Sequence, residues 1–108
     1  MALVRACSRS EIPVGGLKFI NAAGRDLVIC NVDGKFYAMD NWCTHEQGNL
    51  SAGELNGSIL TCPEHGAQFD TATGRVLLGP DGDRPDTISP EKSYKVVVQG
   101  SDLMVEVP

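Results

Sequence analysis

The sequence predicts an all-β fold, and three observations support this prediction. Short apolar or alternating runs recur along the 108 residues, as is typical of antiparallel strands. Turn sequences that contain Gly, Asn or Asp separate these runs. No long stretch repeats its apolar residues with the helical period of about 3.6, and residues 91–98 are too rich in β-branched side chains to favour a helix.

The expected strands and turns follow from this pattern in chain order. Ala23-Gly24 and Asp33-Gly34 have the composition of tight hairpin turns, because Gly and Asp tolerate a positive φ. Gly74 is expected at a positive φ in a longer hairpin loop, and the Gly-, Pro- and Asp-rich stretch 79–86 is expected to be an irregular loop. The strands are expected at residues 17–20, 26–32, 36–40, 58–61, 67–70, 94–99 and 103–107.

The composition indicates one globular domain spanning residues 1–108. This length is usual for a single domain, and a hydrophobic share of 42% with 21% charged residues is ordinary for a globular protein. The net charge of −5 argues against nucleic acid as a partner, since phosphate binding needs a basic face. The sequence has no signal-peptide pattern and no apolar run near the ~20 residues of a membrane span. We therefore expect a cytoplasmic protein without membrane contact.

Two short motifs contain the candidate site residues. Cys43-x-His45 and Cys62-x-x-His65 each place one cysteine close to one histidine, and together they contain both histidines of the chain. Two cysteines with two histidines are the ligand set of a Rieske [2Fe-2S] centre and also a possible zinc set. The motifs therefore predict a metal centre bound by these four residues.

A disulfide framework is the alternative for the cysteines. Four cysteines allow three pairings, but disulfides would leave both Cys–His pairs as coincidence, and cytosolic thiols stay reduced. Cys30 lies in an apolar run and Cys7 follows a short apolar segment, so both are expected to be buried thiols that do not bind metal.

Spacing and charge separate the two possible metal centres. Zinc-finger spacings normally pair Cys with Cys and His with His, which the alternating order here fits poorly. In a [2Fe-2S] centre, His45 and His65 would bind one iron, and Cys43 and Cys62 would bind the other. Two ferric ions, two sulfides and two thiolates carry no net charge with neutral imidazoles. Such a centre accepts an electron more easily than a four-cysteine centre.

The second motif and its surroundings resemble the Rieske family. Residues 62–74 read C-P-E-H-G-A-Q-F-D-T-A-T-G, which matches the family pattern C-P-x-H-G-x-x-F-D-x-x-T-G. The resemblance includes residues 50–57 and the closing strands, so it covers essentially the whole chain. It implies stacked antiparallel β-sheets with a cluster-binding subdomain, about residues 41–70, at one tip. It also implies that a proline-containing loop around Pro80 covers the cluster.

Within this resemblance, the residues near the cluster indicate a low potential. High-potential members carry two more cysteines, which form a disulfide between the ligand loops; Gly48 and Glu64 occupy those positions here. They also place Ser and Tyr hydroxyls against the cluster sulfurs, where this chain has Ala67 and Phe69. Together with the carboxylates of Glu46 and Glu64, these differences predict a potential of roughly −150 mV.

The chain is therefore similar to the small Rieske ferredoxins of bacterial aromatic-ring-hydroxylating dioxygenases. The resemblance implies a monomeric electron carrier, not an enzyme, with one [2Fe-2S] cluster per chain. It would pass electrons from a flavin-containing reductase to a terminal oxygenase in aromatic hydrocarbon catabolism. An oxygenase α subunit would need a further mononuclear-iron site, and the chain has no spare histidine for one. The alternatives are the small subunit of an assimilatory nitrite reductase and a structural zinc module.

Both partners are expected to dock in turn at the tip that carries the two histidine ligands. Glu46 and Glu64 lie beside those ligands, so a basic patch on at least one partner should steer the encounter. If the contacts are apolar instead, Trp42, Leu50 and Pro80 are the nearest candidates.

Overall fold

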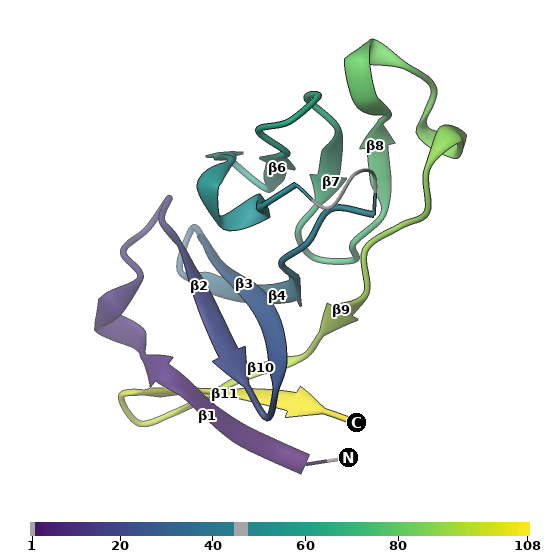
Figure 1. Ribbon diagram of the computed structural model, residues 1–108. Helices are drawn as coiled ribbons and strands as arrows, with labels where there is room; N and C mark the ends of the chain where they lie inside the picture. Colours follow the sequence, from purple (N-terminus) through teal and green to yellow (C-terminus); the bar gives the residue numbers. More distant parts are fainter. Residues whose placement is uncertain (1, 45–47) are drawn as a thin grey trace.

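The computed structural model describes residues 2–44 and 48–108, and its strands form three antiparallel sheets (Figure 1). His45 and Glu46, which the sequence places at the site, lie outside the described residues. The strands are β1 (Ala2–Ser8), β2 (Leu17–Ala22), β3 (Arg25–Val32), β4 (Lys35–Asp40), β5 (Glu54–Asn56), β6 (Ile59–Thr61), β7 (Gln68–Asp70), β8 (Val76–Leu78), β9 (Ser93–Tyr94), β10 (Val96–Gln99) and β11 (Asp102–Val107). Short 3₁₀ helices are η1 (Arg9–Glu11), η2 (Leu50–Ala52), η3 (Pro80–Gly82) and η4 (Pro85–Thr87).

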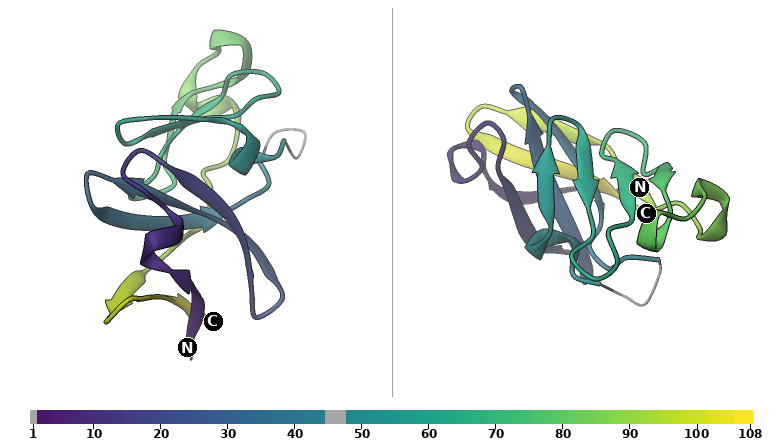
Figure 2. Two further views of the ribbon diagram at one scale, coloured as in Figure 1. Left: turned by 90° about the vertical axis from the view of Figure 1, so that its left-hand side faces the viewer. Right: turned by 90° about the horizontal axis from the view of Figure 1, so that it is seen from above.

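The three sheets are stacked. One has the strand order β1-β11-β10, the second β2-β3-β4-β9 and the third β5-β6-β7-β8. Figures 1 and 2 show the first two sheets together at the end that holds both termini, which we call the base. The third sheet and its loops form the opposite end, which we call the tip. The predicted all-β fold with stacked antiparallel sheets is confirmed.

Strand β3 separates two apolar cores. Because successive side chains of a strand point to opposite faces, Leu27 and Ile29 face the base while Val28 and Cys30 face the tip. The base core consists of Cys7, Ile12, Ile20, Ala22, Leu27, Ile29, Ala38, Tyr94, Leu103, Val105 and Val107. The tip core consists of Val28, Cys30, Met39, Cys43, Leu50, Leu60, Cys62, Ala67, Phe69 and Val76.

The predicted turns are present. Ala23 and Gly24 have φ values of 51° and 79°, and Asp33 and Gly34 have 53° and 89°, as a hairpin turn with two left-handed residues requires. Gly74 has φ 78°, as expected for the loop between β7 and β8. A side chain at this position would also overlap the backbone carbonyl of Glu91, so the residue must be small.

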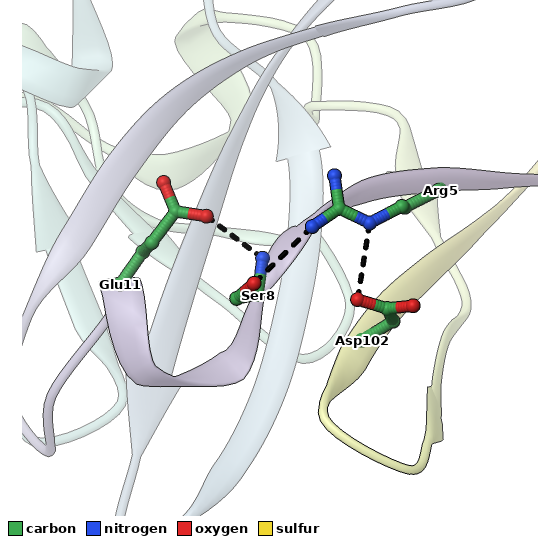
Figure 3. Close-up of polar contacts among 4 residues, drawn as sticks. All are labelled: Arg5, Ser8, Glu11 and Asp102. Carbon is green, nitrogen blue, oxygen red and sulfur yellow. Dashed lines mark hydrogen bonds and ion pairs between the residues drawn. The ribbon is translucent and has the colours of Figure 1, made fainter.

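Three strands were not predicted from the sequence, and one predicted strand is divided. Strand β1 pairs with β11, and its Arg5 donates a 3.0 Å hydrogen bond from Nε to Asp102, as Figure 3 shows. Strands β5 and β8 have only three residues each. The expected strand 94–99 is two strands, because β9 pairs with β4 while β10 pairs with β11. None of the described helices is both long and apolar enough to cross a membrane.

Candidate metal centre

The two ligand motifs lie in loops with the same backbone closure. The N–H of Cys43 donates to the carbonyl of Gly48 at 2.8 Å, and the N–H of Cys62 donates to the carbonyl of Ala67, also at 2.8 Å. In each loop, therefore, a hydrogen bond joins the cysteine to the residue five positions later. The second loop is tightened further by Gly66, whose φ is 76° and whose N–H donates to the Cys62 carbonyl. The two sequence motifs thus lie in segments that equivalent backbone hydrogen bonds close.

Both cysteines are buried in the tip core. Cys43 is 1% exposed and Cys62 is 2% exposed, and neither forms a disulfide bond. Ala67 and Phe69, which stand where high-potential relatives carry hydroxyls, belong to the same core and are also fully buried. The sulfurs therefore lie in an apolar environment, and the two side chains from the second loop supply no hydroxyl donor to them.

The two loops approach each other closely at Gly48. A Cβ atom built on Gly48 would lie only 2.5 Å from the Cys62 Sγ and 2.7 Å from the Glu64 Cγ, which is closer than any real Cβ contact. The first loop thus needs glycine here so that its backbone can pass beside the second cysteine. The same contact shows that positions 48 and 64 face each other, as the comparison with disulfide-containing Rieske proteins implied.

His65 lies at the solvent edge of the second loop, under the loop of residues 79–86. Its side chain is 37% exposed, and its Nδ1 is 3.5 Å from the Asp81 Oδ1. The Asp81 N–H also donates to the His65 carbonyl at 2.6 Å, and Asp81 has a left-handed φ of 56°. The loop that contains Pro80 therefore covers the second ligand loop, although most of its residues are exposed.

A buried amide holds the ends of the first loop together. Asn41 is fully buried and donates from Nδ2 to the Asn49 Oδ1 at 2.9 Å, while its own Oδ1 accepts the N–H of Ser51 at 3.0 Å. Its backbone carbonyl accepts the N–H of Leu50. Asn41 thus connects the residues before and after the first ligand motif. Sequence reasoning missed this residue, because a single Asn before a motif has no distinguishing pattern.

Trp42 attaches the first loop to the base. Its indole N–H donates to the Asp26 Oδ2 at 3.0 Å, and the residue is 43% exposed. Hydrogen bonds from Trp42 and Asn21 lower the pKa of Asp26, because they stabilise the charged carboxylate. Leu50, by contrast, is 0% exposed and belongs to the tip core, so its expected role as a docking residue is wrong.

The remaining cysteines are structural. Cys30 is 1% exposed, and burial raises its pKa to about 12. Burial, followed by the negative charge of Glu11, also raises the pKa of Cys7. A thiol that stays protonated is a poor metal ligand. The prediction that Cys7 and Cys30 are buried is confirmed.

The arrangement fits an iron–sulfur cluster. Two cysteines from two loops share one buried apolar core, and the glycine at position 48 lets the first loop pass directly beside the Cys62 sulfur. His65 belongs to the same loop as Cys62 but lies nearer to solvent. Within residues 2–44 and 48–108, no three Cys, His, Asp or Glu side chains converge on one point. Thiolates and an imidazole on two loops are the donors that a Rieske centre uses.

Comparisons with known proteins agree with this site. The Rieske [2Fe-2S] domain family matches residues 2–105. The ferredoxin component of the naphthalene 1,2-dioxygenase system from Pseudomonas aeruginosa is 34% identical, over 96% of this chain and 94% of that protein. The Sphingomonas yanoikuyae B1 ferredoxin has a TM-score of 0.85 and 29% identity, with 99% of this chain and 100% of that chain covered.

A further solved structure contains a ferredoxin together with its partner. It is described as a complex of reduced oxygenase and oxidized ferredoxin in carbazole 1,9a-dioxygenase, and it matches with a TM-score of 0.82 and 28% identity. The match covers 95% of this chain and 91% of that chain. Sequence motifs, fold and relatives lead to one conclusion: the chain belongs to the Rieske [2Fe-2S] domain family.

Proposed function

We propose that this chain is the ferredoxin component of a ring-hydroxylating dioxygenase system. It carries one electron at a time from a flavin-containing reductase to a terminal oxygenase and is itself not an enzyme. The main support for this proposal is that two loops with equivalent closing hydrogen bonds place Cys43 and Cys62 in one buried apolar core. The relatives named above are ferredoxins, and one was solved in complex with its oxygenase.

Cys43, His45, Cys62 and His65 are the proposed ligands. When bound, a [2Fe-2S] cluster accepts and releases one electron without any bond to a substrate. Cys43 and Cys62 hold their sulfurs in the tip core and exclude water from them. His65 stands at the exposed edge, where a partner can approach closely. The paired Cys and His motifs support this ligand set, of which His45 lies outside the described residues.

The surface around His65 is acidic. Glu64 is exposed beside it, and the covering loop contributes Asp81, Asp83 and Asp86, with Arg84 as a positive charge paired to Asp86. The chain has a net charge of −5. A carrier that must leave one partner to reach the next favours a small interface with electrostatic steering. We propose that the tip docks on a basic patch of at least one partner, with Trp42 and Pro80 as the accessible apolar residues.

We further propose that residues 1–108 form one domain with the cluster held by about residues 41–70, that the protein acts as a monomer, and that it works in the cytoplasm. The match of the family over residues 2–105 supports a single domain.

Metal analysis and a redox titration test the proposal. The purified protein should contain about two irons and two acid-labile sulfides per chain and should take up one electron. The reduced protein should then be reoxidised by the oxidised oxygenase component of a ring-hydroxylating system. One zinc per chain without sulfide would overturn the cluster assignment. A loaded, reducible protein that transfers no electron to any such oxygenase would overturn the role and leave the cluster intact.

Charge reversal tests the docking surface. Glu64→Lys should slow association with the partner that carries the basic patch and should weaken the salt dependence of that rate. Glu54→Lys is the matched control, because Glu54 is exposed on the same sheet but lies outside both ligand motifs. The potentials of both variants must be measured, since a charge near the site also changes the driving force. Equal rates for both variants and the unmodified protein would contradict electrostatic docking at the tip.

A further inference from the structure

Glu91 is a buried carboxyl group that has no ion-pair partner within residues 2–44 and 48–108. The residue is 4% exposed, and neither of its carboxyl oxygens has a hydrogen-bond partner among the described residues. Buried carboxyl groups are normally paired, because an isolated charge in a low-dielectric interior is very unfavourable. A group of this kind is unusual at a position with no evident structural need for it. It therefore points to a function that depends on its proton.

The surroundings of Glu91 connect it to the first ligand loop. Its backbone N–H donates to the Gly74 carbonyl at 2.8 Å, which fixes the segment against the loop between β7 and β8. The backbone of Thr44, the residue next to Cys43, faces the carboxyl group and favours its charged form, although no hydrogen bond of good geometry is made. Glu91 is thus packed against the loop that carries the first proposed cysteine ligand.

The charged groups around Glu91 come from strands β3 and β4 and from the segment that precedes β9. Asp40, at the end of β4, is an acidic group whose negative charge acts on Glu91, and it accepts a 2.7 Å hydrogen bond from the Tyr94 hydroxyl. Arg25 and Lys92 lie over the Tyr94 ring, at 6.0 Å and 5.5 Å from its centroid, and Arg25 donates to its hydroxyl. The cations thus face the tyrosine, while the group that faces Glu91 is a carboxylate.

These surroundings keep Glu91 protonated at neutral pH. Burial, followed by the negative charge of Asp40, raises the pKa of Glu91 to about 8. The group therefore changes its charge in the weakly alkaline range. Charges interact strongly over short distances in a protein interior, so an electron added at the site must favour the protonated form of a nearby carboxyl group.

We propose that Glu91 is a proton-binding site coupled to electron uptake by this protein. In the weakly alkaline range, the Glu91 carboxylate takes a proton from solvent when the protein is reduced, and releases it when the electron leaves. One electron and one proton enter together, so the net charge of the protein does not change. By linkage, the proton increases the affinity for the electron by the same factor as the electron increases the affinity for the proton. This inference rests on the ligand set proposed above.

The reduction potential of the loaded protein as a function of pH tests the inference. In the unmodified protein the reduction potential should begin to fall near pH 8. Above that pH, the affinity for the electron should decrease by up to tenfold per pH unit, which is about 59 mV for one electron. Glu91→Gln should remove the fall in potential that begins near pH 8. Only the fall at higher pH, which comes from the histidine ligands, should remain. Glu106→Gln, which removes a carboxyl group on β11 in the base, should behave like the unmodified protein.

A second variant gives an independent result. Asp40→Asn removes the negative charge that raises the pKa of Glu91, so the onset of the slope should move to lower pH. If Glu91→Gln does not assemble a cluster, the pH profile of Asp40→Asn tests the inference in its place. An unchanged pH profile in a loaded Glu91→Gln variant, or in Asp40→Asn when Glu91→Gln cannot be loaded, would overturn the inference. An unmodified protein that contains no [2Fe-2S] cluster would overturn the proposed function instead.

Discussion

The base and the tip of this molecule are stabilised in different ways. In the base, strands β1, β2, β3 and β11 have six to eight residues each and enclose an apolar core. In the tip, strands β5 to β8 have three residues each. The tip instead depends on loops that polar contacts close, and its core contains both proposed cysteine ligands. We therefore expect the base to fold by apolar burial alone, whereas the tip should need a bound cluster to stay ordered.

The largest expected effect follows from removing one proposed ligand. Cys62→Ser should abolish the cluster, and amide protection against hydrogen exchange should then collapse in residues 41–78 while the base strands keep most of theirs, because metal binding contributes to folding. Cys30→Ala is the control, since this thiol lies in the same core outside the ligand motifs. It should keep the cluster. Equal loss of protection in base and tip would show that the two regions do not differ as described.

The next effect compares the two cores across one pair of strands. Ile29→Ala opens a cavity in the base core and Met39→Ala opens one in the tip core, and each should cost about 2–5 kcal/mol of unfolding free energy. Ile29→Ala should leave the potential unchanged. Met39→Ala should change the potential or the cluster lifetime, because it loosens the core around the cysteines. Chemical denaturation and voltammetry measure the two effects, and a potential that moves only in Ile29→Ala would reverse the comparison.

An effect of comparable size concerns pH at the junction of base and tip. Glu91 has a folded-state pKa of about 8, above the ordinary value of 4.5 for the unfolded chain. Between these two values the folded protein holds a proton that the unfolded chain has released, so stability must fall as pH rises from about 4.5 to 8. The folding equilibrium changes by up to tenfold per pH unit in that window.

Glu91→Gln should flatten this stability profile and make the protein more stable than the unmodified one near pH 8. Thermal unfolding of the loaded protein at several pH values between 5 and 9 measures this dependence of stability on pH, with Glu106→Gln as the control. A stability that rises with pH across this window would contradict the raised pKa of Glu91.

The smallest effect is a change in potential from two hydroxyl groups. Ala67→Ser with Phe69→Tyr places hydroxyls in the tip core, where they can donate to the sulfurs and favour the reduced state. The expected rise is on the order of 1 kcal/mol, or about 40 mV for one electron. The unmodified protein should lie near the low end of the Rieske range, roughly −150 mV. A value near +300 mV in the unmodified protein would show that the missing hydroxyls do not set the potential.

Much of the fold was predictable because its signals are local. The turns at Ala23-Gly24 and Asp33-Gly34 require residues that accept a positive φ, and the continuous apolar run of β3 indicates a strand buried on both faces. Strand β1 was not predictable in this way. It exists because the chain ends meet, with β1 paired to β11, and no local pattern contains that pairing.

The ligand motifs were predictable for a different reason. Cysteine and histidine are rare in this chain, so their joint spacing in two short segments has few explanations. Residues that only support the site, such as Asn41 and Asp81, have ordinary sequence surroundings and could not be found. Their roles arise from contacts with other segments of the chain: Asn41 accepts the N–H of Ser51, and the Asp81 N–H donates to the His65 carbonyl.

The sequence by itself determined the all-β class, the turns and the two Cys–His motifs that are the proposed ligands. These depend on backbone preferences and on the side chains that can bind iron, both of which belong to individual residues. The tertiary structure decided that Leu50 is buried rather than available for docking and that the segment 94–99 divides between two sheets. It also decided that Glu91 lies beside the first proposed ligand loop with no hydrogen-bond partner among the residues that the structure describes. Burial and electrostatic environment depend on which distant segments pack together, so they exist only in the folded chain.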